Sequence, residues 1–201
     1  MLDARLRRLI DPLLDRLGAP LAARGLSANA VTVAGFAIGL CAAVAIAWRA
    51  YLLGLGLLLL NRLCDGLDGA IARRRGLTDL GGFLDILLDF LIYSAVPFAF
   101  ALADPAANAL AAAFLIFSFM GTGSSFLAFA IMAAKRGMST ELRGRKSLYY
   151  LGGLTEGTET ILVFVLACLW PAWFPWLALI FGLLCWLTTA TRIALAVQML
   201  R

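Results

Sequence analysis

Long apolar runs separated by short polar breaks dominate this chain of 201 residues. Hydrophobic residues make up 63% of it and charged residues only 14%, an apolar share well above that of soluble domains. A helix needs roughly 20 apolar residues to cross a bilayer, and six runs approach this length. We expect spans at residues 31–48, 51–71, 82–103, 106–134, 159–173 and 176–200. The pattern predicts an all-α, polytopic membrane protein in which residues 1–201 form one domain, with a six-helix bundle at 31–200.

The N-terminal segment, residues 1–25, has a different pattern. Its apolar residues recur at steps of three and four, with charged residues between them, at Leu2, Leu6, Ile10, Leu13 and Leu17. This spacing predicts an amphipathic helix lying on the membrane surface, with membrane lipid as its partner. A helix packed on the cytosolic loops is the alternative. The charges also interrupt the apolar core that a cleavable signal peptide requires.

Basic residues gather in alternate loops and so predict an orientation. They lie before the first expected span, between the second and third, between the fourth and fifth, and at the end of the chain. In the turns on the opposite side, Arg49 is the only basic residue. Because positive charge stays on the cytoplasmic side, we expect both termini in the cytoplasm. This asymmetry explains the formal charge of +5, and no nucleic-acid partner is expected. The chain has no histidine, which excludes triads and zinc sites built on histidine.

Four aspartates lie inside or at the edge of the second and third expected spans: Asp65, Asp68, Asp85 and Asp89. Their spacings of three and four residues place each pair on one helix face, and a short loop makes the two helices neighbours. Carboxylates are costly in a membrane unless they face a polar cavity, one another or a cation. Their oxygen atoms suit hard divalent cations, commonly Mg²⁺ with substrate phosphates. Cation transport or a proton relay is the alternative use of such a cluster.

Small and basic residues follow the first aspartate pair. Gly69 and Ala72 leave the backbone open to a flat ligand or to another helix. Arg73 presents a fixed guanidinium fork that suits phosphate, and Gly81 opens the third expected span, where helix N–H groups favour an anion. Together these residues predict a phosphate-containing substrate held beside divalent metals at the membrane face.

Two runs of this chain resemble the signature of a known family: DGLDGAIAR at 65–73 and GGFLDILLD at 81–89. The family is that of the CDP-alcohol phosphotransferases, which are six-helix membrane enzymes of phospholipid synthesis. The connection between Arg73 and Gly81 is one residue shorter than is usual in the family. The resemblance extends to the amphipathic N-terminus and the six spans. The stretch at 146–160 resembles a small bacterial inner-membrane branch of the family, which implies an inner-membrane location.

This resemblance implies a reaction and roles for individual residues. A phosphatidyl or other substituted phosphate group would pass from a CDP-linked lipid, such as CDP-diacylglycerol, to the hydroxyl of an alcohol acceptor, with release of CMP. One or two Mg²⁺ or Mn²⁺ ions would be held by Asp65, Asp68, Asp85 and Asp89. The CDP pocket would be lined by Gly69, Ala72, Arg73 and Gly81. Asp89 would act as the general base, and the protein would form a homodimer.

The acceptor alcohol stays open. Five basic residues between the fourth and fifth expected spans could bind an anionic acceptor or simply carry cytoplasmic loop charge: Lys135, Arg136, Arg143, Arg145 and Lys146. Glu156 and Glu159 could bind a neutral polyol or an amine. Glu159 could equally pair with Arg145 or Arg192 as plain structure. Arg192 itself lies inside the last expected span and needs a partner there.

Overall fold

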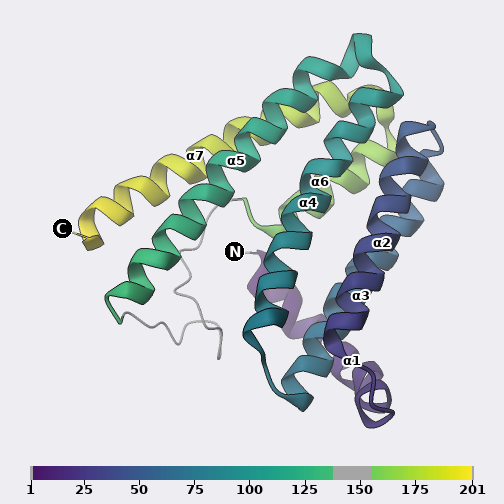
Figure 1. Cartoon of the computed structure of the whole chain (residues 1–201). Helices are drawn as coiled ribbons and strands as arrows, with labels where there is room; N and C mark the ends of the chain where they lie inside the picture. Colours follow the sequence, from purple (N-terminus) through teal and green to yellow (C-terminus); the bar gives the residue numbers. More distant parts are fainter. Residues whose placement is uncertain (1, 138–154, 201) are drawn as a thin grey trace.

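The computed structural model describes residues 2–137 and 155–200, and every regular element in these ranges is a helix. Seven α-helices and one short 3₁₀-helix (η1) follow in the described part of the chain (Figure 1): α1 (Leu2–Ala23), α2 (Ala28–Ala47), α3 (Tyr51–Arg75), α4 (Asp79–Ala103), α5 (Pro105–Lys135), α6 (Gly157–Leu169), η1 (Pro171–Trp173) and α7 (Phe174–Leu200). The prediction of an all-α fold is confirmed.

Four segments of the described chain, α2, α4, α5 and η1 with α7, are long and apolar enough to cross a membrane. Helix α3 has 25 residues, but its second half carries Arg62 and two of the aspartates. Helix α6 has only 13 residues and ends at Leu169, before the predicted residue 173. Pro171 explains this early end, because it lacks the N–H group that an α-helix would need there. The six-span topology stays a prediction.

The helices form a bundle with two parts. Helix α2 packs against α3 and α4, and α5 packs against α4 and α7. Figure 1 shows α5 and α7 side by side, diverging from α2, α3 and α4 toward the end of the molecule where α1 lies. The α3–α4 connection lies at that same end, and the α2–α3 and α4–α5 turns lie at the other. The α3–α4 connection, which follows the arginines at the end of α3, therefore lies at the opposite end of the molecule from the α2–α3 and α4–α5 turns. The charge pattern predicts the same separation across the membrane.

Glycines on α2 bring its backbone close to both neighbours. A Cβ at Gly35 would lie 2.8 Å from the Cβ of Cys64 on α3, and one at Gly39 would lie 2.5 Å from Cδ1 of Ile92 on α4. Small residues at such crossings allow membrane helices to pack through their backbones. The close crossing brings Asn61 of α3 within reach of the α2 backbone, where its Nδ2 donates a hydrogen bond of 2.8 Å to the Gly35 carbonyl.

Stacked aromatic rings join three helices at the end of the bundle away from the aspartates. Phe100 of α4 stacks on Phe174 of α7 with 4.3 Å between ring centroids, and on Tyr51 of α3 with 5.6 Å between them. Phe100 and Phe174 are almost completely buried. Offset stacking of this kind adds to the stabilisation that burial of the rings provides. The rings therefore hold together the ends of α3 and α4 that carry no charged cluster.

The N-terminal helix has two apolar faces. Ile10, Leu13 and Leu17 are exposed, as the predicted membrane-surface face requires. Leu14 is only 8% exposed and contacts the α3 backbone at Gly66, where an added Cβ would lie 2.6 Å from Leu14 Cδ1. At Gly18, an added Cβ would lie 2.9 Å from the Cβ of Ala70. One face of α1 thus packs on helix α3, not on the loops, while the other face stays exposed. The position of α1 on the membrane surface stays a prediction.

Candidate active site

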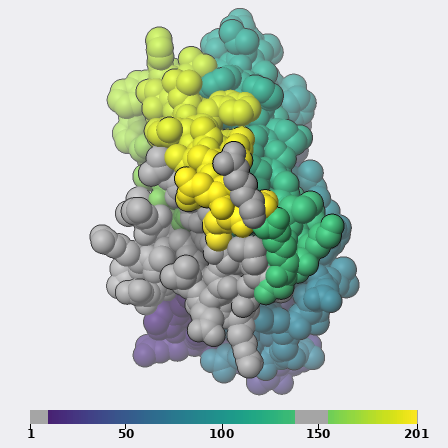
Figure 2. All heavy atoms as spheres, turned by 90° about the vertical axis from the view of Figure 1, so that its left-hand side faces the viewer, coloured from purple at the N-terminus to yellow at the C-terminus, as the bar shows by residue number. Residues whose placement is uncertain are grey.

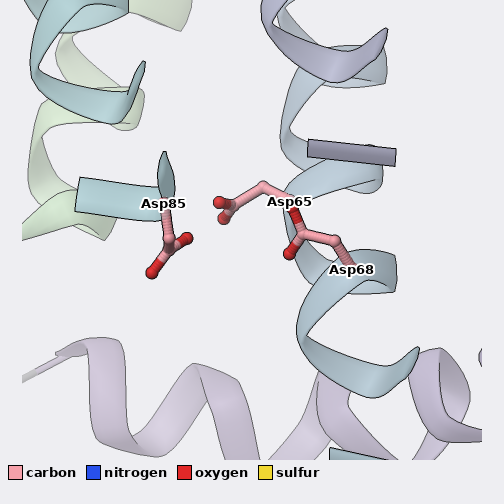
Figure 3. Close-up of side chains that lie close together, drawn as sticks. All are labelled: Asp65, Asp68 and Asp85. Atoms are coloured by element: carbon pink, nitrogen blue, oxygen red, sulfur yellow. The ribbon is translucent and has the colours of Figure 1, made fainter. Parts of the chain in front are cut away.

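Three carboxylates meet between α3 and α4. Asp65 and Asp68 come from α3, and Asp85 comes from the first half of α4. Figure 3 shows the three carboxylates gathered in the space between the two helices. One oxygen from each lies within 4.8 Å of the others. The helical spacing therefore places these aspartates as the sequence predicted, and the result is a group able to share one cation.

The cluster fits a divalent ion with oxygen ligands. Asp68 is 6% exposed, and its Oδ2 is buried without a hydrogen-bond partner among the described residues. A buried carboxylate oxygen left without a partner is costly, and a cation would satisfy it. The cavity at the cluster has a volume of about 10 Å³, and its polar lining consists of the four aspartates, Thr32, Asn61 and Arg62. Oxygen-only ligands of this type favour Mg²⁺ or Mn²⁺ over soft metals.

The fourth aspartate, Asp89, lines the same cavity but has different partners. Its Oδ1 accepts a hydrogen bond of 2.7 Å from Nη2 of Arg62, and its Oδ2 lies 3.4 Å from the Tyr93 hydroxyl that donates to it. It is not among the three carboxylates whose oxygens converge. The predicted metal ligands thus divide into a group of three and one aspartate held by an arginine.

Arg62 is the site residue that the sequence analysis left without a role. It lies on α3, one helical turn before Asp65, and its Nη1 is 3.7 Å from Oδ2 of that residue. Its Nε donates a 2.9 Å hydrogen bond to Oδ1 of the neighbouring Asn61, and its guanidinium carbon lies 5.7 Å from the centroid of the Tyr93 ring. A signal existed, because an arginine inside an apolar span, three residues from a carboxylate, needs a charged partner.

Arg73, predicted for the CDP pocket, forms an ion pair with the N-terminal helix. Its Nη2 lies 2.8 Å from Oδ1 of Asp15, and a Cβ built at Gly69 would lie 3.4 Å from its Nη1. The guanidinium therefore spans from α1 to the surface of α3 at Gly69. Ala72, the third small or basic residue predicted for this pocket, is partly exposed on the next turn. These three residues share one surface at the end of α3.

Gly81 lies in the first turn of α4, facing α2. Its N–H donates a 3.0 Å hydrogen bond to the hydroxyl of Thr78, the N-cap residue. An added Cβ at Gly81 would lie 3.1 Å from Oδ1 of Asn29 on α2. The close approach explains why glycine stands here. The Gly81 N–H group, which was predicted to favour an anion, already donates to Thr78. A ligand would therefore use the space beside Gly81 rather than its N–H group.

The residues considered for the acceptor mostly stabilise helix ends in the structure. Glu156 and Glu159 form the capping box of α6, in which the Glu156 N–H donates to Oε2 of Glu159 at 3.1 Å. Arg136 donates hydrogen bonds to the carbonyls of Met199 and Leu200 and so ties α5 to α7. Arg192 donates a 2.9 Å hydrogen bond to the Thr122 carbonyl. Lys135 is exposed at the end of α5, and Arg143, Arg145 and Lys146 lie outside the described residues.

Residues 25–193 match the model of the CDP-alcohol phosphatidyltransferases. The chain belongs to this family. The match begins after α1 and includes α2 to α6 and most of α7, and therefore all four aspartates. The recognition made from the motif is thus confirmed, and the protein is a membrane-embedded transferase of phospholipid biosynthesis.

Individual relatives agree with this family. The inner membrane protein YnjF of Escherichia coli (strain K12) is 59% identical over 193 residues, which is 96% of this chain and 94% of that protein. An archaetidylinositol phosphate synthase of Methanothermobacter thermautotrophicus is 40% identical over 87 residues, 43% of this chain and 41% of its own length. The crystal structure of Mycobacterium tuberculosis phosphatidylinositol phosphate synthase (PgsA1) with CDP-DAG bound has a TM-score of 0.66 and 19% identity, covering 92% of this chain and 94% of its own. That similarity shows a shared fold.

Proposed function

We propose that this protein transfers a phosphatidyl group from CDP-diacylglycerol, or a similar CDP-linked lipid, to the hydroxyl of an alcohol and releases CMP. The observation that carries the proposal is the convergence of Asp65, Asp68 and Asp85 around one small cavity, in the part of the chain that matches the family. The structural neighbour PgsA1, which has CDP-DAG bound, supports a CDP-linked lipid as donor.

The three clustered carboxylates would hold a divalent ion, Mg²⁺ or Mn²⁺. Bound there, such an ion supplies positive charge that offsets the donor's pyrophosphate and the CMP leaving group. The guanidinium of Arg73, beside Gly69 and Ala72, would bind a donor phosphate at the end of α3. Gly69 and Gly81 leave space in which the nucleotide can approach the two helices closely. The site would thus orient the donor phosphate toward the carboxylates.

Asp89 is suited to act as the general base. The acceptor oxygen would attack the phosphorus that carries diacylglycerol, the bond from this phosphorus to the CMP oxygen would break, and the acceptor proton would pass to the Asp89 carboxylate. Asp89 lines the same cavity as the three clustered carboxylates, so an acceptor hydroxyl placed beside the ion, at the edge of this cavity, would be within its reach. The Arg62 and Tyr93 contacts hold the carboxylate in one orientation.

We place the reaction at the cytoplasmic face of a bacterial inner membrane, with both termini cytoplasmic and two copies forming a homodimer. The basic connection after α3 and the similarity to an inner membrane protein support this placement. The archaetidylinositol phosphate synthase match makes an inositol phosphate the first acceptor to test. A neutral polyol has lost support, since Glu156 and Glu159 cap α6 in the structure.

The test is CMP release by the full chain in detergent micelles, given CDP-diacylglycerol, Mg²⁺ or Mn²⁺ and a panel of acceptors. The panel contains inositol phosphate, glycerol 3-phosphate, inositol, serine, glycerol and choline, with Asp85→Asn as the inactive control. Release that depends on both the acceptor and Asp85 establishes the reaction and names the alcohol. If no acceptor supports release, and neither CMP nor CDP-lipid raises the melting temperature, the proposal fails and cation transport regains weight.

A further inference from the structure

A groove with a volume of about 560 Å³ lies along the contact between α5 and α7, away from the acidic cavity. Its lining side chains come from residues 125–132 of α5 and 192–200 of α7, and most of them are apolar. Figure 2 shows these ends of the two helices beside each other. No lining residue of the groove also lines the acidic cavity. The groove is therefore a separate feature, on helices that carry none of the four aspartates.

The groove begins where the two helices part. Before this point they are in close contact, because a Cβ added at Gly182 of α7 would lie 2.6 Å from Cε1 of Phe114 on α5. The two segments that line the groove contain no glycine, and larger side chains keep membrane helices further apart. Beyond the groove, Arg136 donates hydrogen bonds to the carbonyls of Met199 and Leu200. Helix contacts thus bound the groove at both ends.

Apolar side chains are exposed along the groove near one end of the helices. Met132, Ile193 and Val197 are 44%, 54% and 44% exposed. Helix α5 has 31 residues, which gives it a length of about 46 Å. Even at a tilt of about 40° it crosses more than the roughly 30 Å of the hydrocarbon core, so its ends reach the headgroup regions. Apolar surface at that level gains free energy when a hydrocarbon chain covers it.

The charge around the groove has one sign. Lys135 is exposed in the last turn of α5, and Arg136 follows it. Arg192 lines the groove at the other end, where its Nη1 donates a 2.9 Å hydrogen bond to the Thr122 carbonyl. Neither α5 nor α7 contains an aspartate or a glutamate. Exposed basic residues at the membrane surface attract anionic lipid headgroups.

We propose that this groove binds one chain of an anionic phospholipid from the surrounding membrane, with the headgroup phosphate at Lys135 and Arg136. The chain covers the exposed apolar wall, and the phosphate meets the basic end of α5. The bound lipid is distinct from the donor lipid, whose phosphates belong beside α3 and α4. The inference needs the membrane location that the family gives, and it does not depend on the proposed reaction.

A binding measurement tests the headgroup without any turnover. The full chain is purified in a non-ionic detergent, delipidated and titrated in native mass spectrometry with phosphatidylglycerol or with phosphatidylcholine that has the same chains. The wild type should bind one phosphatidylglycerol per chain about fivefold or more tightly than phosphatidylcholine. Lys135→Gln should bring the two affinities to within about twofold, because the charge that attracts the anionic phosphate is reduced. Lys135→Arg, which keeps the charge, should retain the preference.

A second variant tests whether the groove holds the chain. Ala128 lines the groove and is exposed, so Ala128→Phe places a ring in the space of the lipid chain without filling a packed core. Phosphatidylglycerol affinity should fall by about tenfold or more, since several methylenes lose their contact. Ala113→Phe makes the same change at an exposed position of α5 outside the groove and is the matched control.

Three results would overturn the inference. Equal affinities of the wild type for the two lipids would exclude recognition of an anionic headgroup. Binding of phosphatidylglycerol by Ala128→Phe with the affinity of the wild type would place the lipid elsewhere. Loss of a dimer in Ala128→Phe, with lipid binding unchanged, would assign the groove to a second copy of the chain. None of these results bears on CMP release, which reports separately on the proposed function.

Discussion

The two parts of the bundle each contain a largely buried arginine, Arg62 on α3 and Arg192 on α7, in surroundings of opposite character. Between α3 and α4, Arg62 faces carboxylates beside a cavity of about 10 Å³. Between α5 and α7, Arg192 donates to a backbone carbonyl and lies over the ring of Phe126, at the wall of a cavity of about 560 Å³ lined mostly by apolar side chains. Figure 2 shows the C-terminal half of α7 lying against the end of α5 on this side of the molecule.

This difference indicates that the part of the bundle that binds the ion is separate from the part that contributes mainly helix packing. A small cavity walled by charged oxygens suits an ion and phosphate groups, whereas a large apolar one suits hydrocarbon. Substitutions near the first cavity should therefore change metal binding and CMP release. Substitutions in the helix contact beside the second should change stability and leave metal binding alone.

Asp85→Asn should have the largest effect. It removes one of three converging carboxylates, and with it most of the affinity for the ion. We expect CMP release to fall by at least about 10⁴-fold, since ion binding and the charge it supplies are lost together. Mn²⁺ titration and the CMP assay on the same preparation measure both. Normal Mn²⁺ binding by this variant would show that the three-carboxylate group is not the metal site.

Asp89→Asn should separate catalysis from metal binding. The substitution keeps the shape of the side chain but removes the base, so CMP release should fall by about 100-fold or more. Mn²⁺ should still bind, because Asp89 is held by Arg62 and lies outside the converging group. The comparison with Asp85→Asn is the control. A CMP release rate like that of the wild type would remove Asp89 from the role of base.

Much of this site was predictable because helical spacing is a local property. The intervals between Asp65 and Asp68, and between Asp85 and Asp89, place each pair on one face, and the apolar pattern around them predicts membrane helices. The separation of Asp89 from the other three was not predictable. It depends on which carboxylate the Arg62 side chain reaches, and that choice follows from distances across three helices.

The position of α1 shows the same limit. The spacing of Leu13 and Leu17 predicts an exposed apolar face, and the structure leaves both residues exposed. The second face depends on Gly66 and Gly18, whose missing side chains let α1 and α3 approach. A glycine indicates that close approach is possible, but it does not name the partner. The Arg73–Asp15 pair follows from that docking and was therefore invisible in the sequence.

Gly182→Ala tests the part formed by α5 and α7. An added Cβ would lie 2.6 Å from Cε1 of Phe114 and 3.0 Å from Oγ of Ser118, so α5 or the Phe114 ring must move. We expect the free energy of unfolding to fall by about 1–3 kcal/mol, with Mn²⁺ affinity unchanged. Thermal unfolding in detergent measures the first quantity. Gly56→Ala is the matched control, because nothing lies within 4 Å of its added Cβ; weaker Mn²⁺ binding in Gly182→Ala alone would break the separation.

Asp15→Asn should have the smallest effect and tests whether α1 belongs to the site. Asp15 and Arg73 are 42% and 44% exposed, so their ion pair is screened by solvent and contributes little to stability. Its loss should nevertheless leave the Arg73 guanidinium less oriented toward a donor phosphate. We expect the KM for CDP-diacylglycerol to rise by about two- to fivefold with kcat unchanged. Because salt screens the Asp15–Arg73 pair, the difference in KM between the wild type and the variant should shrink as the salt concentration rises.

The control for this variant is Asp11→Asn, which makes the same charge change on the same helix. Equal effects of the two substitutions would mean that the net charge of α1 matters, and not the Asp15–Arg73 contact. A fall in kcat at constant KM would also contradict the prediction, because a residue that only orients Arg73 for binding does not touch the reacting atoms. If KM alone responds, and only to Asp15, the helix that precedes the family-matched region is part of the donor site, and the acidic part of the bundle extends to the membrane surface.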